Sequence, residues 1–387
     1  MRTRSHRRNV TLRMMCAAIT IGAFIVDTTG QDHPRARDLG IRPGIYDPGP
    51  LNAITDVDPV RVGHTTIVEG DAVRTGVTAI LPHGGNLFQD KVAGAVFVGN
   101  AFGKLTGSTQ VHELGTIETP IVLTNTLSVG IAMDAVVRHT LAQAGNEQVR
   151  SVNPLVGETN DGGLNDIRGL HVTREHVLQA IQNARSGPVA EGSVGAGTGT
   201  ICYGWKGGIG TASRRIRPGA AGQDQYTVGI LAQTNFGGNL TIAGVPVYRA
   251  LQPPSRRGSR AAGPNPNDGS CMLVVATDAP LDSRNLERLA ARAVFGLGRT
   301  GSAYSNGSGD FAIAFSTSPE MRSRFNDLSP RSRQTLPPDA ASPLFEAALE
   351  ATEEAVYNSL FQATTIASSV GRAEAIPVER VRQLLKR

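Results

Sequence analysis

The chain has 387 residues, of which 40% are hydrophobic, so it can bury a substantial core as one large domain or two ordinary ones. Its formal net charge of +5 is concentrated at the start, because residues 1–30 contain five arginines and one acidic residue. The remaining 33 basic and 32 acidic residues nearly balance, which argues against a nucleic-acid-binding protein, whose basic surface would have to lie in the folded part.

Residues 1–30 have the pattern of a signal peptide. Arginines precede an apolar run at 14–26, which is too short to span a membrane and fits the hydrophobic region of an export signal. Small residues at 28–30 offer a cleavage site, and a disordered basic tail is the alternative interpretation. We therefore expect a periplasmic or secreted protein that has no stable insertion in a membrane.

The remaining chain alternates between blocks of strands and helices. Residues 31–55 form a Pro- and Gly-rich arm, and Thr173 is the predicted N-cap of a helix. Apolar periodicity predicts strands at 59–69, 74–82, 92–98, 119–124, 199–203, 226–234, 240–248 and 271–277, and helices at 129–144, 173–185, 283–295, 343–367 and 378–385. Blocks without strict β-α-β alternation indicate an α+β fold.

The junction Gly269-Ser270 is the most informative position. A polar run at 253–268 changes abruptly into the apolar strand 271–277, which predicts a surface loop that leads into a buried strand. Cleavage of this peptide bond would place a free α-amine beside the hydroxyl of Ser270, so that one residue would supply both nucleophile and base. On the dipeptide alone, a simple loop-to-strand transition that contains a serine is the better interpretation.

The sequence does not support a nucleotide site, a metal site or the nucleophile elbow of a Ser-His-Asp hydrolase. Gly195–Gly199 is followed by a β-like segment and not by a helix, so close backbone packing is a better interpretation than a dinucleotide site. The histidines have no metal-site spacing, and no G-x-S-x-G elbow is found. We expect no metal and no cofactor. Cys202 and Cys271 are interpreted as small buried side chains, although a disulfide is allowed.

Several segments together resemble the P1 family of peptidases, the S58-type L-aminopeptidase/D-esterase and β-aminopeptidase group. They occur in order and cover most of the chain after the leader: Gly76–Ile80, Gly99–Lys104, Glu113–Pro120, Gly157–Asp161, Gly195–Gly199, Gln233–Gly237, Asp268–Cys271, Ala276–Pro280 and Gly307–Asp310. No single segment is diagnostic, but so many in order are hard to obtain by chance.

The resemblance implies a four-layer α-β-β-α sandwich with two stacked, mainly antiparallel sheets, an architecture like that of N-terminal-nucleophile hydrolases. It also implies that a single peptidase domain, residues 31–387, cleaves itself between Gly269 and Ser270. The products would be an α chain, 31–269, and a β chain, 270–387. Such αβ units are expected to assemble into a homo-oligomer.

The resemblance also assigns roles around Ser270, the nucleophile. Ser308 and Asp310 would face it, although Ser-Gly-Asp taken alone predicts a turn in which Asp310 caps the loop before a strand. Many relatives have glutamate at the Asp310 position. Asn235 matches the residue whose amide helps to form the oxyanion hole, and its alternative role is that of a strand-end turn residue.

Glu158 matches the carboxylate that receives the amino group of the substrate. An aminopeptidase needs such an acid, because an ammonium group loses hydration in the pocket unless it is paired. Asn160 lies where some relatives carry an aromatic hydroxyl, and it is a second candidate for substrate binding.

The predicted function is therefore that of a self-processing serine aminopeptidase acting on peptides, amino-acid amides or esters. Either the freed α-amine of Ser270 or the Ser308–Asp310 pair would accept the hydroxyl proton. Two alternatives remain: an acyltransferase similar to the ornithine acetyltransferases, which use threonine at this junction, and a non-catalytic exported binding protein.

Overall fold

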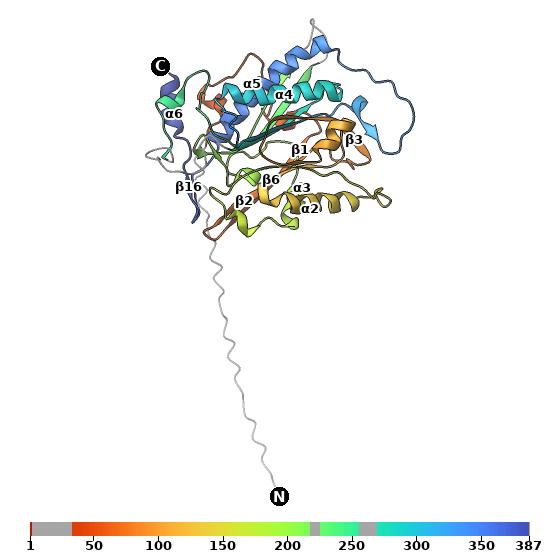
Figure 1. Ribbon diagram of the computed structural model, residues 1–387, viewed down its shortest axis with the longest axis horizontal. Helices are drawn as coiled ribbons and strands as arrows, with labels where there is room; N and C mark the ends of the chain where they lie inside the picture. The colour runs from red at the N-terminus through yellow and green to blue at the C-terminus, as the bar shows by residue number, and fades with distance from the viewer. Residues whose placement is uncertain (2–32, 217–224, 255–268, 387) are drawn as a thin grey trace. The chain divides into compact units, whose positions relative to one another are not determined.

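Two β-sheets lie at the centre of the computed structural model, between layers of helices (Figure 1). The structure describes Met1 and residues 33–216, 225–254 and 269–386. Residues His33–Arg387 cluster as one compact unit. The predicted leader beyond Met1, and most of the polar run predicted before the cleavage junction, lie outside the described residues.

The larger sheet has seven strands and includes the strand that begins at Ser270. Six strands follow in the order β10 (Gly208–Ile216), β11 (Tyr226–Asn235), β12 (Ser270–Thr277), β13 (Gly309–Ser316), β3 (Asp90–Ala101) and β14 (Ser323–Arg324), and β5 (Thr116–Ile117) pairs with β3. β12 and β13 are parallel, and the other pairs are antiparallel. Because β12 and β13 are parallel, they begin at the same edge of the sheet.

The smaller sheet has five strands. Their order is β1 (Arg61–Glu69), β2 (Val73–Leu81), β6 (Ile121–Asn125), β7 (Leu155–Thr159) and β4 (Leu105–Thr106), and β6 and β7 are the parallel pair. Two short pairs lie outside both sheets: β8 (Ile201–Cys202) with β9 (Trp205–Lys206), and β15 (Ile366–Ala367) with β16 (Arg372–Ala373).

Helices cover the outer face of each sheet (Figure 1). α4 (Ser283–Arg299) and α5 (Ser342–Phe361) pack on the larger sheet, and α2 (Val129–Leu141) and α3 (Arg174–Gln182) pack on the smaller one. The short helices are α1 (Ser108–Leu114), beside β3, and α6 (Val378–Leu385). The predicted four-layer α-β-β-α sandwich with mainly antiparallel sheets is confirmed.

The strand that begins at Ser270 is buried on both faces. Met272 and Val274 belong to the apolar core between the sheets, whereas Leu273 and Val275 belong to the core beneath α4 and α5. A strand covered on both faces has a continuous apolar sequence, which explains the abrupt change after residue 269.

Most elements lie close to their predicted ranges, with a few exceptions. The predicted strand at 240–248 is wrong, because this segment makes a tight turn around Ala243 and Gly244, which both have positive φ, and then a 3-10 turn at Val247–Arg249. The predicted helix 343–367 ends at Phe361. β7 and β10 were not predicted as strands.

The glycines of β10 have a packing role that concealed the strand. A Cβ atom added to Gly210 would lie 1.9 Å from the carbonyl oxygen of Ala355, so the backbone of α5 rests directly against the strand. Gly197 and Gly199 are equally crowded by backbone atoms of Gly208 and Arg74, which confirms the packing interpretation of the 195–199 segment. Cys202 and Cys271 are free and buried.

A buried ionic cluster connects segments from both sides of the predicted cleavage point. Arg214 on β10 binds Glu350 at 3.1 Å and Glu354 at 2.7 Å on α5, and Arg37 of the N-terminal arm also binds Glu354 at 3.0 Å. Loss of one partner would leave a buried charge unpaired, which costs several kcal/mol. These contacts would hold the two pieces together after cleavage.

Candidate active site

The predicted site residues meet at one edge of the larger sheet because of strand register. Ser270, the first residue of β12, pairs with Asn235 at the end of β11 and with Gly309 at the start of β13. Ser308 and Asp310 flank Gly309 and are therefore brought to the same edge. All of these polar side chains are buried.

The Gly269-Ser270 peptide is held in a conformation that requires glycine. Gly269 has φ +152°, and an added Cβ atom would lie 2.1 Å from the carbonyl oxygen of Asn235. The backbone N–H of Gly309 donates to the Gly269 carbonyl oxygen at 3.2 Å and to Ser270 Oγ at 3.3 Å. One donor thus contacts both the carbonyl of the junction and the hydroxyl beside it.

Ser308 and Asp310 form a hydrogen-bonded pair next to this junction. Ser308 Oγ donates to Asp310 Oδ2 at 2.8 Å. Burial raises the pKa of Asp310 to about 6, and hydrogen bonds from the Ser308 hydroxyl and the Cys271 backbone offset part of that effect. A carboxyl group that titrates near pH 6 suits proton transfer close to neutral pH.

The strand explains why Asp310 is not a turn cap. β13 begins at Gly309, so Asp310 lies within the strand and not in a loop before it, and its side chain binds the Ser308 hydroxyl. The pairing of β13 with β3 is irregular between Asp310 and Phe311. Irregularities of this kind redirect side chains at the edges of sheets.

The side-chain amide of Asn235 is fixed by two hydrogen bonds. Its Oδ1 accepts from the backbone N–H of Ile201 at 2.9 Å, and its Nδ2 donates to the carbonyl oxygen of Asn160 at 3.0 Å. The second Nδ2 hydrogen is left for another acceptor, because an amide nitrogen carries two. The side chain of Asn160 is exposed and accepts from the backbone N–H of Gly162, so Asn160 meets Asn235 through its main chain.

Glu158 lies on β7 of the smaller sheet and is 2% exposed. Its Oε1 accepts from the backbone N–H of Lys104 at 2.9 Å and lies 3.6 Å from Lys104 Nζ. Lys104 Nζ also donates to Thr126 Oγ1 at 2.6 Å. Burial raises the pKa of Glu158, and contacts with Lys104 and Thr126 lower it in part.

Gly103 shows that Glu158 and Gly309 are close neighbours. A Cβ atom added to Gly103 would lie 3.1 Å from Glu158 Oε1 and 3.5 Å from Gly309 Cα. Because the N–H of Gly309 contacts Ser270 Oγ, the structure brings the predicted nucleophile and the predicted amine-binding acid into one site, although they lie on different sheets.

Three features of the site were not predicted from the sequence: the Gly309 N–H, Lys104 with its partner Thr126, and the side chain of Phe102. Phe102 is 70% exposed beside the site, and its N–H binds the carbonyl oxygen of Ser308. Segment 99–104 contributed only to the family resemblance. A lysine that follows Phe-Gly has no separate sequence signal for pairing with Glu158.

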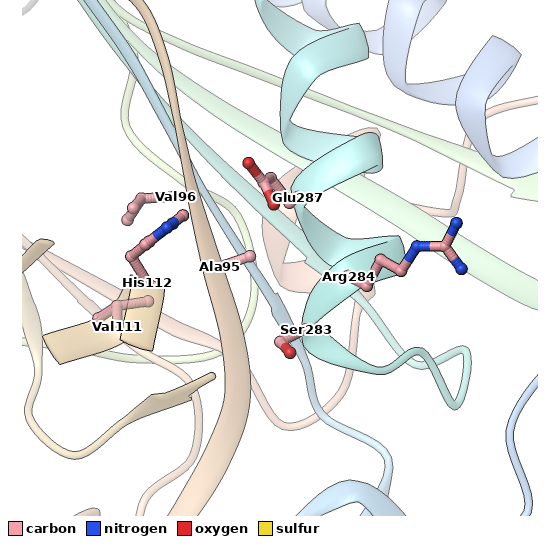
Figure 2. A pocket seen from close by; sticks show the side chains of 7 residues that line it. All are labelled: Ala95, Val96, Val111, His112, Ser283, Arg284 and Glu287. Atoms are coloured by element: carbon pink, nitrogen blue, oxygen red, sulfur yellow. The ribbon is translucent and has the colours of Figure 1, made fainter. Parts of the chain in front are cut away.

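Two cavities lie away from these residues. One, of about 160 Å³, lies between β3, α1 and α4, and Figure 2 shows Arg284 extending away from His112. The other, of about 400 Å³, is lined by Asp90, Pro319 and three arginines at the opposite end of β3 from Ala101. Neither cavity includes a predicted site residue.

Within 33–216, 225–254 and 269–386, no group of three or more His, Cys, Asp or Glu side chains could hold a metal ion. In the same part of the chain, no helix is both long enough and apolar enough to cross a membrane.

The sandwich and the serine at the start of a central strand define the class of protein. The model for peptidase family S58 matches residues 52–374, so the chain belongs to this family, and the predicted resemblance is confirmed. The chain is 44% identical to "Beta-peptidyl aminopeptidase BapA" of Sphingosinicella microcystinivorans over 390 residues, which cover 96% of each protein.

Solved structures agree with this assignment. The L-aminopeptidase D-Ala-esterase/amidase of Ochrobactrum anthropi, described as a prototype for the serine aminopeptidases and a variant of the Ntn hydrolase fold, superposes with a TM-score of 0.83. It is 39% identical, and the match covers 91% of this chain and 98% of that one. A Burkholderia sp. beta-aminopeptidase gives a TM-score of 0.82 at 41% identity with the same coverage. The predicted Ntn-like fold is confirmed.

Proposed function

We propose that this protein is a serine aminopeptidase that matures by cleaving its own Gly269–Ser270 bond. The observation that carries the proposal is the geometry of that bond. The Gly309 N–H is hydrogen bonded to the carbonyl oxygen that would become the oxyanion and also to the hydroxyl that would attack it. A donor placed in advance where negative charge develops is an effective form of transition-state stabilisation.

Maturation would proceed by acyl transfer within the chain. Ser270 Oγ attacks the Gly269 carbonyl carbon, and its proton passes through the Ser308–Asp310 pair to the departing nitrogen of Ser270. The C–N bond breaks, and an ester joins Gly269 to Ser270 Oγ. Water hydrolyses this ester, which leaves a carboxylate on Gly269 and a free α-amine and hydroxyl on Ser270.

Turnover would use the same hydroxyl on an external substrate. Ser270 Oγ attacks the carbonyl of the substrate's first residue, and the freed α-amine, with an ordinary pKa of about 7.7–8.0, accepts its proton. The remaining Nδ2 hydrogen of Asn235 stabilises the oxyanion. The amine product leaves, water hydrolyses the acyl-enzyme, and Glu158 holds the substrate's ammonium group throughout.

The relatives support the nature of the substrate. Those of known name are beta-peptidyl aminopeptidases or an L-aminopeptidase D-Ala-esterase/amidase, so we propose peptides, amides or esters with a free N-terminal amine, including β-amino acids. In a β-aminoacyl group, two carbon atoms separate the amine nitrogen from the scissile carbonyl carbon.

Ser270→Ala tests the proposal most simply. The variant is expected to remain one chain on a denaturing gel and to hydrolyse no amino-acid anilide, whereas the wild type yields two fragments and is active. An uncut wild-type chain with full activity would contradict the proposed chemistry.

Export and assembly are separate proposals. The pattern of residues 1–30 supports removal of a signal peptide and a periplasmic or secreted location. Cell fractionation tests the location, and light scattering of the purified protein tests the proposed homo-oligomer of αβ units.

A further inference from the structure

The carboxylate proposed to bind the substrate's amine already has a cationic partner. Lys104 Nζ lies 3.6 Å from Glu158 Oε1, and the backbone N–H of Lys104 donates a hydrogen bond to the same oxygen. The Lys104 side chain is 54% exposed, whereas the Glu158 side chain is 3% exposed. The pair therefore consists of a buried carboxylate and a more exposed lysine.

This pair changes what the site should bind. Glu158 and Lys104 together are neutral, so a substrate that brings only an ammonium group leaves one uncompensated positive charge in a partly buried site. A substrate that brings an ammonium and a carboxylate keeps the site neutral. Imperfectly compensated charges are costly in such surroundings, so charge balance favours the second kind of substrate.

Lys104 has the donors needed for a second ligand. A lysine ammonium group has three hydrogens, of which one is donated to Thr126 Oγ1 and one faces Glu158. Lysine also has a long and flexible stem, so that its Nζ can turn toward a new acceptor while it remains near Thr126.

We propose that the site selects N-terminal residues that carry a free carboxylate on the same carbon as the free amine, and that the substrate class is β-aspartyl peptides and amides. This inference rests on the proposed aminopeptidase function. A β-aspartyl residue is a β-alanyl residue with a carboxylate on the carbon that bears the amine. Glu158 would bind its ammonium group and Lys104 its carboxylate, while the β-carbonyl faces Ser270.

The reaction needs no additional reagent. The bond between the β-carbonyl carbon and the leaving nitrogen breaks as the ester to Ser270 Oγ forms, and the serine proton is delivered to that nitrogen. Water then hydrolyses the ester and releases aspartate. The carboxylate bound by Lys104 does not react.

The test compares three 4-nitroanilides on the mature enzyme: β-alanyl, β-aspartyl, and β-aspartyl whose α-carboxylate is replaced by a carboxamide. Hydrolysis is followed by release of 4-nitroaniline. The wild type is expected to hydrolyse the α-carboxylate form with a kcat/KM about tenfold or more above that of its carboxamide twin, the range of one charge-assisted hydrogen bond. This comparison requires no variant.

Variants then assign the preference to Lys104. Lys104→Met, which keeps the length of the stem, should remove the preference for the carboxylate form, and Lys104→Arg should retain much of it. Lys386→Met, beyond the end of α6, removes an equal charge elsewhere and should keep the wild-type ratio. The ratio between twin substrates is not changed by a general loss of folded enzyme.

The outcomes separate this inference from the proposed function. Hydrolysis of β-alanyl anilide with no preference for the carboxylate twin would overturn the inference and leave the aminopeptidase proposal standing. A preference that survives in Lys104→Met would also overturn it. If the cleaved enzyme hydrolyses neither the three substrates nor any other anilide with a free amine, both proposals fail.

Discussion

Asp310 offers the sharpest test of how maturation is catalysed. In the proposed maturation, the nitrogen of Ser270 is still an amide and cannot act as base, so we propose that the Ser308–Asp310 pair accepts the hydroxyl proton. With a pKa of about 6, Asp310 is about 90% ionised at pH 7 and about 10% ionised at pH 5. Maturation of the wild type should therefore slow about tenfold between pH 7 and pH 5.

Asp310→Asn should slow maturation strongly and abolish the dependence of the maturation rate on pH. Loss of a positioned acid–base group typically costs about 10²–10⁴-fold. In the proposed mechanism the freed α-amine would replace the pair once cleavage has occurred, so turnover by the matured fraction should fall much less. The assay follows precursor synthesised in a cell-free system, shifted to buffers between pH 5 and 8, and scored by the fragment that begins at Ser270.

Stability provides the control for this variant. Burial raises the pKa of Asp310 from 3.8 to about 6, so ionisation of this carboxyl group lowers the stability of the folded state. This loss of stability is absent below pH 4, grows between pH 4 and pH 6, and reaches its full size above pH 6. Two pKa units correspond to about 3 kcal/mol. In an uncut Ser270→Ala background, Asp310→Asn should therefore unfold at the same or higher urea concentration at pH 7.

Wild-type maturation in Asp310→Asn, or maturation independent of pH between 5 and 7, would refute the role given to this carboxylate.

Three further substitutions test other parts of the site. Gly269→Ala should block maturation, measured as the uncut fraction on a gel, because its Cβ atom would lie 2.1 Å from the Asn235 carbonyl oxygen; wild-type cleavage would show that the junction is not constrained. Asn235→Ala should lower the kcat of the matured fraction by about 10²–10³-fold, and unchanged turnover would remove Asn235 from the oxyanion site. Glu158→Gln should lower kcat/KM for a free-amine anilide by about tenfold or more, and equal rates on that anilide and its N-acetyl twin would show that the site does not select amines.

Much of this fold could be predicted because its signals are local. The apolar run after Ser270 and the helical spacing at 129–144 gave elements near their observed bounds. β10 was missed because its glycines resemble a loop, although they admit the backbone of α5. The strand predicted at 240–248 was wrong because a turn at Ala243 and Gly244 outweighs the apolar pattern.

The sequence named the residues of the candidate site, but it could not give their geometry. The family resemblance named Glu158 and Ser270, yet only the stacking of two sheets shows that they face one site. The contact between Lys104 and Glu158 joins residues 54 positions apart, and the Gly309 N–H is a backbone group that leaves no mark in the sequence. These features follow from register and packing.

Intact-mass analysis of the purified protein tests the central claim most directly. We predict two polypeptides, of which the smaller has the 118 residues from Ser270 to Arg387 and an N-terminal sequence of Ser-Cys-Met-Leu, and a single uncut chain for Ser270→Ala. A fully active wild-type protein recovered as one uncut polypeptide would contradict the account.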